Sequence, residues 1–151
     1  MRSIDIHAHI SPAAFIDAME DGEDWHGITS HAINAHRNNP RTVWTPEQRL
    51  ADMDSLGVDV QVLSINAVLY NYDKDASTVS AMARDCNDYV SQLTKDHPDR
   101  FAGLCTLPMQ DIPASIDELE REMTELGLKR AMIGDHVNGR TFDEPEFLPF
   151  W

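Results

Sequence analysis

The order of apolar segments along the chain constrains its fold more than any other feature. Four short segments of strand character begin near residues 3, 58, 101 and 129, and a stretch with helical periodicity precedes each of the last three. Consecutive strands joined by helices form right-handed parallel βαβ units. A parallel sheet is covered on both faces, by two helix layers or by closure into a barrel. The fold class is therefore α/β, and periodicity alone leaves both arrangements open.

Capping residues define the limits of the expected helices. Thr45 and Pro46 suit the cap and first turn of a helix, and Gln48 completes a capping box. Gly57 and Gly127 stand where left-handed caps would end two helices. The three helices are expected at about residues 46–56, 75–96 and 113–126.

One region interrupts this alternation. Residues 20–43 are polar and show no sustained period, so we expect an inserted excursion after the first strand. No other break is visible, and we expect one domain over residues 1–151 that contains this excursion.

Charge and apolar content exclude several classes of partner. The 26 acidic residues outnumber the 12 basic ones and give a formal net charge of −14, which disfavours nucleic acids and anionic membranes. No apolar run approaches the roughly 20 residues of a membrane span, and the first residues do not resemble a signal peptide. With only Cys86 and Cys105 present, a disulfide framework is not indicated. We expect a cytoplasmic protein.

Two histidines on the first expected strand form the main candidate site. His7 and His9 are two residues apart, so their side chains point the same way and are close enough to share one cation. Neutral imidazole suits zinc and other borderline divalent metals. By the same period Asp5 would share their face and could order an imidazole or a neighbouring backbone group. The alternative is a metal-free pair, but two imidazoles on a buried face are costly without a ligand.

The residues around this pair resemble a known family. The segment from Ile4 to His9 is similar to the strand-one signature of the amidohydrolase superfamily. Residues 44–50 and 53–59 resemble the amidohydrolase-related branch that includes aminocarboxymuconate semialdehyde decarboxylase and γ-resorcylate decarboxylase. The match continues through residues 97–101, 107–108, 133–136 and 143–147. The resemblance covers essentially the whole chain.

The resemblance implies a distorted (β/α)₈ barrel that holds one divalent ion, usually zinc. The ligands would be His7, His9, a later His and a late Asp, and an acid–base His and Asp would also come later. About four β/α units are expected here, the N-terminal half of such a TIM-type barrel. The chain also ends inside an apolar segment, Phe147–Trp151, where a polar terminus is more usual. We therefore expect a truncated chain or a second chain that supplies the C-terminal half, and either a homo-oligomer or association with that half.

Three further residues are candidate substrate ligands. In the aminocarboxymuconate decarboxylase pattern, an arginine spaced from Trp44 as Arg37 is belongs to the substrate-carboxylate site, although Arg41 competes for that alignment. A guanidinium fork suits a carboxylate. His136 and Asn66 follow expected strands and would stand at the catalytic face of a barrel. The alternative to substrate binding is a packing role for His136 and a solvated loop position for Arg37.

The glutamates of the third expected helix receive a structural interpretation. Glu118, Glu120, Glu122 and Glu125 could suggest paired catalytic carboxylates, but a solvated helix face explains them better.

Three functions remain open from the sequence. The leading hypothesis is metal-dependent, non-oxidative decarboxylation of a small carboxylated aromatic or muconate-type acid by the intact enzyme. The second is metal-dependent hydrolysis of a lactone or amide by the same half-site. The third is a non-catalytic half-barrel whose role is association.

Overall fold

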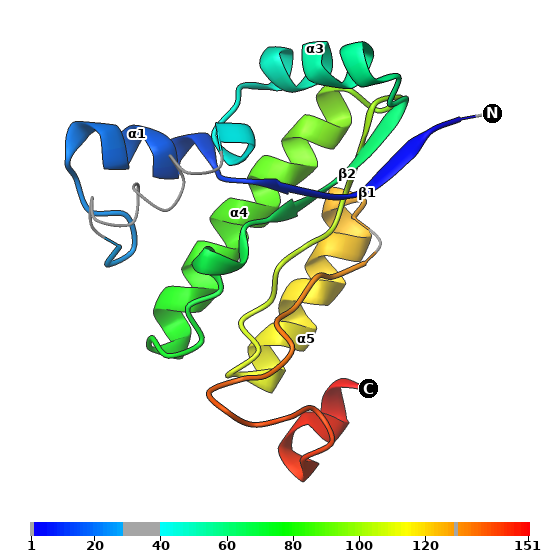
Figure 1. Ribbon diagram of the computed structural model, residues 1–151. Helices are drawn as coiled ribbons and strands as arrows, with labels where there is room; N and C mark the ends of the chain where they lie inside the picture. Colours follow the sequence, from blue (N-terminus) through cyan, green and yellow to red (C-terminus); the bar gives the residue numbers. More distant parts are fainter. Residues whose placement is uncertain (1, 29–39, 129) are drawn as a thin grey trace.

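A three-stranded parallel sheet with helices on one side forms the centre of the molecule (Figure 1). The computed structural model describes residues 2–28, 40–128 and 130–151. Over these ranges the elements are β1 (Ile4–Ile10), α1 (Ala13–Asp21), the 3-10 helix η2 (Pro40–Thr42), α3 (Pro46–Leu56), β2 (Val60–Ile65), the 3-10 helix η3 (Ala67–Leu69), α4 (Ala76–Asp96), β3 (Phe101–Gly103), α5 (Ile112–Arg121), the π-helix η4 (Glu122–Leu126) and the 3-10 helix η5 (Pro145–Phe150). The predicted α/β class is confirmed. Among the described helices, none combines the length and apolarity needed to cross a membrane.

Local chemistry sets the helix limits as predicted. The Thr45 hydroxyl accepts a hydrogen bond from the Gln48 backbone at 3.3 Å, and the Gln48 side chain accepts one from the Thr45 backbone at 3.0 Å. This reciprocal pair caps α3. Gly57 and Gly127 close α3 and η4 with φ of 69° and 81°, values that a residue with a Cβ rarely adopts.

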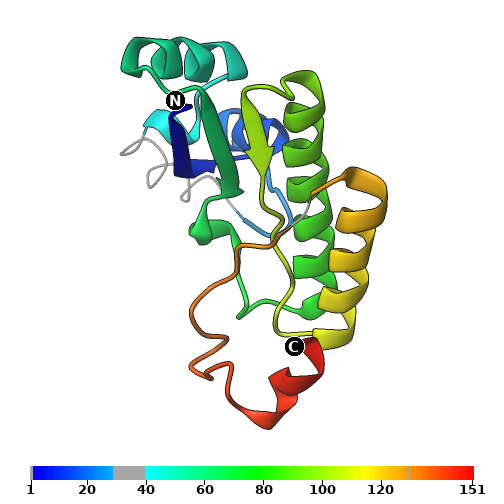
Figure 2. The same ribbon diagram turned by 90° about the vertical axis from the view of Figure 1, so that its right-hand side faces the viewer.

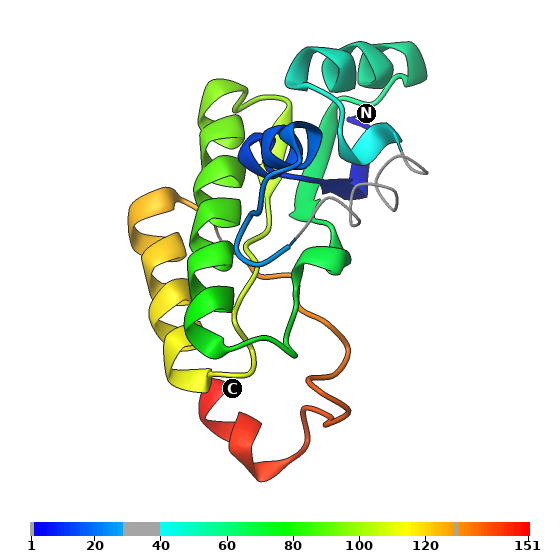
Figure 3. The ribbon, with the colours of Figure 1, turned by 90° about the vertical axis from the view of Figure 1, so that its left-hand side faces the viewer.

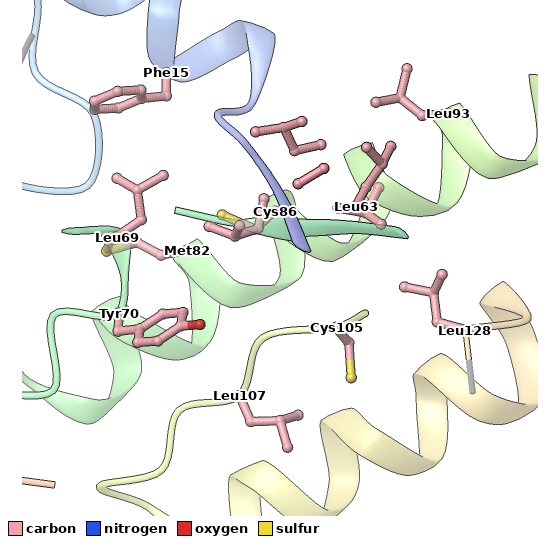
Figure 4. Packing of buried hydrophobic residues seen from close by; sticks show 14 of the residues in the cluster. Phe15, Leu63, Leu69, Tyr70, Met82, Cys86, Leu93, Cys105, Leu107 and Leu128 are labelled. Carbon is pink, nitrogen blue, oxygen red and sulfur yellow. The ribbon is translucent and has the colours of Figure 1, made fainter. Parts of the chain in front are cut away.

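The core lies between the sheet and two long helices. α4 and α5 run side by side along one side of the strands, as Figures 2 and 3 show from opposite directions. Figure 4 shows the apolar side chains that fill this layer, with Leu63 of β2 beside Cys86 of α4. Leu63, Met82, Cys86 and Leu107 are all at most 1% exposed. Burying one such side chain contributes roughly 2 kcal/mol, so this contact layer dominates the stability.

Helix α1 was not predicted. It follows β1 directly and buries Phe15 and Met19, and Phe15 meets the Trp25 ring edge-on at 5.4 Å. Its N-cap position holds Pro12, which makes no side-chain capping bond, so the usual start signal is missing. The central part of the predicted excursion, residues 29–39, lies outside the described residues.

The predicted fourth strand is reduced to one bridge in the described part of the chain. Cys105 and Ala131 form an isolated parallel bridge, and β3 ends at Gly103. Beyond this bridge, the side chain of Asn87 on α4 binds both backbone groups of Thr106, at 2.8 and 3.0 Å. Leu104 bonds to Leu63 of β2, and Cys105 bonds to the backbone of Arg130 and Met132, so the Thr106 groups would face β2. Their capture by Asn87 therefore ends the pairing with β2 and does not account for the short fourth strand.

At Gly103, β3 packs tightly against Val90 of α4 and against Leu128. A Cβ at this position would lie 2.5 Å from Cγ1 of Val90 and 2.7 Å from Cδ2 of Leu128. Because Val90 is β-branched and held in a helix, its side chain cannot turn away freely. We expect Gly103→Ala to lower the free energy of unfolding by about 1–3 kcal/mol, measured by urea denaturation. Ala102→Ser, on the exposed side of β3, is the control. Equal stabilities of the two variants would contradict the tight packing.

Candidate metal centre at the end of the first strand

A β-bulge shapes the strand that carries the two histidines. Asp5 pairs with Gln61 and His9 pairs with Ser64, so β1 holds one residue more than β2 between these pairs. The extra residue falls at residues 6–7 and reverses the alternation of faces. Since Gln61 and Ser64 point to opposite faces of β2, Asp5 and His9 do too. The prediction that Asp5 shares the face of His9 is therefore wrong.

The two imidazoles nevertheless lie against one another. The ring centroids of His7 and His9 are 4.6 Å apart, and the rings meet edge to face at 77°. Nδ1 of His9 is hydrogen-bonded to the buried Ser64 hydroxyl at 3.0 Å, which orients the ring and leaves Nε2 for another partner. His7 is exposed and His9 half-buried. The predicted convergence of the two rings is confirmed, and metal binding by them stays a prediction.

The electrostatic environment of His7 and His9 suits the coordination of a metal cation. Burial, and then the neighbouring His7, lower the pKa of His9, so its ring is neutral at neutral pH. Neutral imidazole is the form that coordinates divalent metals. Over residues 2–28, 40–128 and 130–151, no group of three or more His, Cys, Asp or Glu side chains is placed to hold a metal ion. If they bind a metal as predicted, the two histidines would supply half of a tetrahedral ligand set.

A buried polar network supports the strand beneath the pair. Arg49 of α3 is 5% exposed and donates to the side-chain oxygen of Gln61 at 2.9 Å and to the carbonyl of His9 at 3.0 Å. The Gln61 amide donates to Asp5 at 2.9 Å, and the other Asp5 oxygen accepts from the His7 backbone at 3.1 Å. Asp5 thus orders a neighbouring backbone group, one of its two predicted roles.

The role of Arg49 was missed in the sequence. A signal was available, because Arg49 stands four residues before Met53, which is fully buried. That spacing places both side chains on one face of a helix. An arginine on an apolar helix face needs acceptors inside the protein.

The predicted substrate ligands fall in different surroundings. Asn66 directly follows β2, its backbone donates to Ile10 at 3.1 Å, and its side chain caps η3. His136 is exposed, with Nδ1 bonded to Asp135 at 2.7 Å, and lines a cavity of about 400 Å³. Arg37 lies outside the described residues. Of the two described residues, His136 lines this cavity and Asn66 does not. The substrate role of all three residues stays a prediction.

Two tyrosines line the same cavity and were not predicted. Tyr70 and Tyr72 are each 8% exposed, and their rings stack at 5.7 Å. The Tyr72 hydroxyl accepts from the backbone of Gly134 at 3.2 Å. The Tyr70 hydroxyl points into the core near Leu107 (Figure 4) and has no hydrogen-bond partner among the described residues. Burial raises its pKa to about 12, so the phenol stays protonated.

The glutamates of α5 and η4 divide into two groups. Glu120 and Glu125 are exposed as expected, but Glu118 and Glu122 are 3% and 0% exposed. The solvated-face interpretation is therefore wrong for this second pair. Arg121 donates to both oxygens of Glu118, at 3.0 and 2.7 Å, and to Glu122 at 2.9 Å. Arg121 thus compensates the charge of the buried Glu118 carboxylate and also bonds to Glu122, and the three side chains form a structural cluster.

Known proteins resemble the chain over nearly all its length. It is 32% identical to 2-amino-3-carboxymuconate-6-semialdehyde decarboxylase of Dictyostelium discoideum, over 98% of this chain and 44% of that protein. It is also 32% identical to γ-resorcylate decarboxylase of Rhizobium sp. strain MTP-10005, over 70% of this chain and 34% of that protein. The chain therefore spans less than half the length of these relatives.

The fold agrees with a solved structure. 5-Carboxyvanillate decarboxylase from Novosphingobium aromaticivorans, complexed with manganese and 4-hydroxy-3-methoxy-5-nitrobenzoic acid, superposes with a TM-score of 0.80 and 27% identity. The match covers 99% of this chain and 46% of that one, in agreement with the predicted half barrel. The family model described as amidohydrolase matches residues 4–151. Together these matches show that the chain belongs to the amidohydrolase family.

Proposed function

We propose that the intact enzyme removes carbon dioxide, without oxidation, from a small carboxylated aromatic or muconate-type acid. The observation that carries this proposal is the contact between His7 and His9 at the end of β1, in a chain whose relatives are named as decarboxylases of such acids. One divalent ion would be held by these two histidines together with later residues.

Residues of this chain would have defined tasks in the proposed reaction. His7 and His9 present two nitrogen donors, and Ser64 fixes the orientation of the second ring. When bound, such an ion would supply positive charge that stabilises the negative charge developing on the substrate as carbon dioxide departs. Protonation of that carbon requires a positioned acid, which we expect from the C-terminal half. Zinc is our proposal for the ion because imidazole ligands suit it.

Substrate binding is proposed for three residues. Arg37 would pair with a substrate carboxylate through its planar fork. His136, beside the cavity near Tyr72, and Asn66, at the end of β2, would contact the ring substituents of the substrate. These assignments rest on their places in the sequence and at the ends of the strands.

An open apolar face supports association with a second half of the barrel. Ile4 and Ile6 on β1 are 55% and 76% exposed. Ile6 also lines an apolar hollow of about 990 Å³ together with Val62 and Leu104. Exposed surfaces of this kind recruit partners. We propose that the C-terminal half of the barrel, or a copy of this chain, covers them.

A product assay on the protein at its full natural length tests the reaction. We expect metal-dependent release of carbon dioxide from γ-resorcylate or 5-carboxyvanillate. The carbon dioxide is measured by coulometry or by a coupled assay. Ring-opened acid from a lactone, with no carbon dioxide from any carboxylated substrate, would contradict decarboxylation and support the hydrolase alternative.

A further inference from the structure

The spacing of the two histidines depends on an irregular piece of backbone. The bulge at residues 6–7 lies between the Asp5 and Ala8 pairings. It therefore includes His7, the first residue of the histidine pair. A bulge disrupts the ladder locally and leaves a residue unpaired. Regular pairing with β2 therefore does not hold His7 in place, and other groups have to fix it.

The Arg49 network binds the backbone of both histidines. One branch runs from Arg49 through Gln61 to Asp5 and ends on the backbone N–H of His7, over bonds of 2.9, 2.9 and 3.1 Å. The second branch runs from Nη2 of Arg49 to the carbonyl of His9 at 3.0 Å. The same nitrogen also donates to the Arg41 carbonyl. A single guanidinium thus holds the segment at both ends.

The geometry of this network requires an arginine and a glutamine. Gln61 is 7% exposed and uses its amide oxygen toward Arg49 and its amide nitrogen toward Asp5. Gln61 therefore connects the Arg49 guanidinium to the Asp5 carboxylate by two hydrogen bonds, without direct contact between the two charged groups. A lysine offers one compact charge and cannot reproduce the planar fork. A methionine in place of Gln61 keeps the volume and removes both bonds.

We propose that Arg49, acting through Gln61 and Asp5, is a positioning residue that sets the relative placement of His7 and His9 for metal binding. This inference rests on the proposed metal site. Partners that orient ligands in this way commonly tune affinity by about 10- to 100-fold.

Cobalt binding measures the effect on the site. Titration with Co²⁺, followed by its d–d absorption, should show affinity about 10-fold or more weaker for Arg49→Lys and for Gln61→Met than for the parent chain. The matched control is Arg100→Lys, because Arg100 also bridges a carboxylate, Asp54 at 2.7 Å, and a carbonyl, Asp59 at 3.0 Å, away from the histidines. The control should bind cobalt as the parent does. Equal losses in all three variants would mean general loosening and would overturn the proposal.

Amide exchange of the metal-free chain separates this proposal from the metal site. The backbone amide hydrogen of His7 should exchange faster in Asp5→Ala, Gln61→Met and Arg49→Lys than in the parent. In Arg100→Lys its exchange rate should equal that of the parent. If His7→Ala binds cobalt as the parent does, the proposed metal site fails, and the exchange data still decide the positioning. Unchanged His7 exchange in Gln61→Met and Arg49→Lys would overturn the positioning role whatever the metal result.

Discussion

Replacing Arg121 with methionine should lower the free energy of unfolding by about 3–5 kcal/mol at neutral pH, because it leaves a buried carboxylate without its cation. Arg121 bonds to Glu118 and Glu122, and to Asp88 at 2.8 Å. Burial opposes the ionisation of Glu118, but hydrogen bonds from Arg121 and Asn87 outweigh it and keep the pKa of Glu118 below its usual value. Urea denaturation measures the loss.

Arg84 provides the matched control for this variant. It also pairs with Glu118, at 3.5 Å, but its side chain is 55% exposed. Exposed pairs contribute about 0–1 kcal/mol, so Arg84→Met should change stability little. If Arg121→Met were no more harmful than Arg84→Met, the buried cluster would not hold α5 as described.

Replacing Glu122 with glutamine should flatten the dependence of stability on pH. Burial, and then the adjacent Glu118 carboxylate, raise the pKa of Glu122 from 4.5 to about 8. Between these values the folded chain binds a proton that the unfolded chain has released, so stability falls as pH rises toward 8. Arg121 opposes this shift, and Asp88 adds to it.

The size of the effect follows from the shift. The shift is about 3.5 units and each unit corresponds to roughly 1.4 kcal/mol, so Glu122→Gln should be more stable than the parent by about 4–5 kcal/mol near pH 8. The difference should vanish below about pH 4.5, where both states of the parent carry the proton. Denaturation curves across this range give the result. Glu125→Gln, at an exposed position on η4, should follow the parent curve. Parallel curves for Glu122→Gln and the parent would mean that Glu122 ionises normally in the fold.

Local signals predicted the elements whose chemistry is local. The capping box at Thr45 and Gln48 and the left-handed glycine at 57 act within a few residues, so the sequence alone places α3. The approach of the His7 and His9 rings agrees with the prediction from their spacing, although a bulge shifts the register of β1 between Asp5 and Ala8. The cap of α3 and its terminal glycine depend on no other element of the fold.

The features that the sequence did not predict depend on contacts between elements. The bulge after Asp5 appears only when β1 is aligned with β2, since the alternation of β1 itself is unbroken in the sequence. Pairing with β2 stops after Leu104, and Asn87, on α4, takes the backbone groups of Thr106 instead. Burial of Glu118 also requires Asn87, which donates to it at 2.9 Å from the neighbouring helix. In each case a contact with another element of the fold is involved.

Zinc binding by this chain tests the central claim, that His7 and His9 form half of a metal site. Equilibrium dialysis or competition with a chromogenic chelator should show weak binding that His7→Ala and His9→Ala each reduce, because two imidazoles leave a tetrahedral site half filled. His97→Ala, whose ring contacts Phe101 at the start of β3, should bind as the parent does. Joining the C-terminal half should tighten binding greatly. Tight, stoichiometric zinc that persists in the double variant His7→Ala and His9→Ala would contradict the claim.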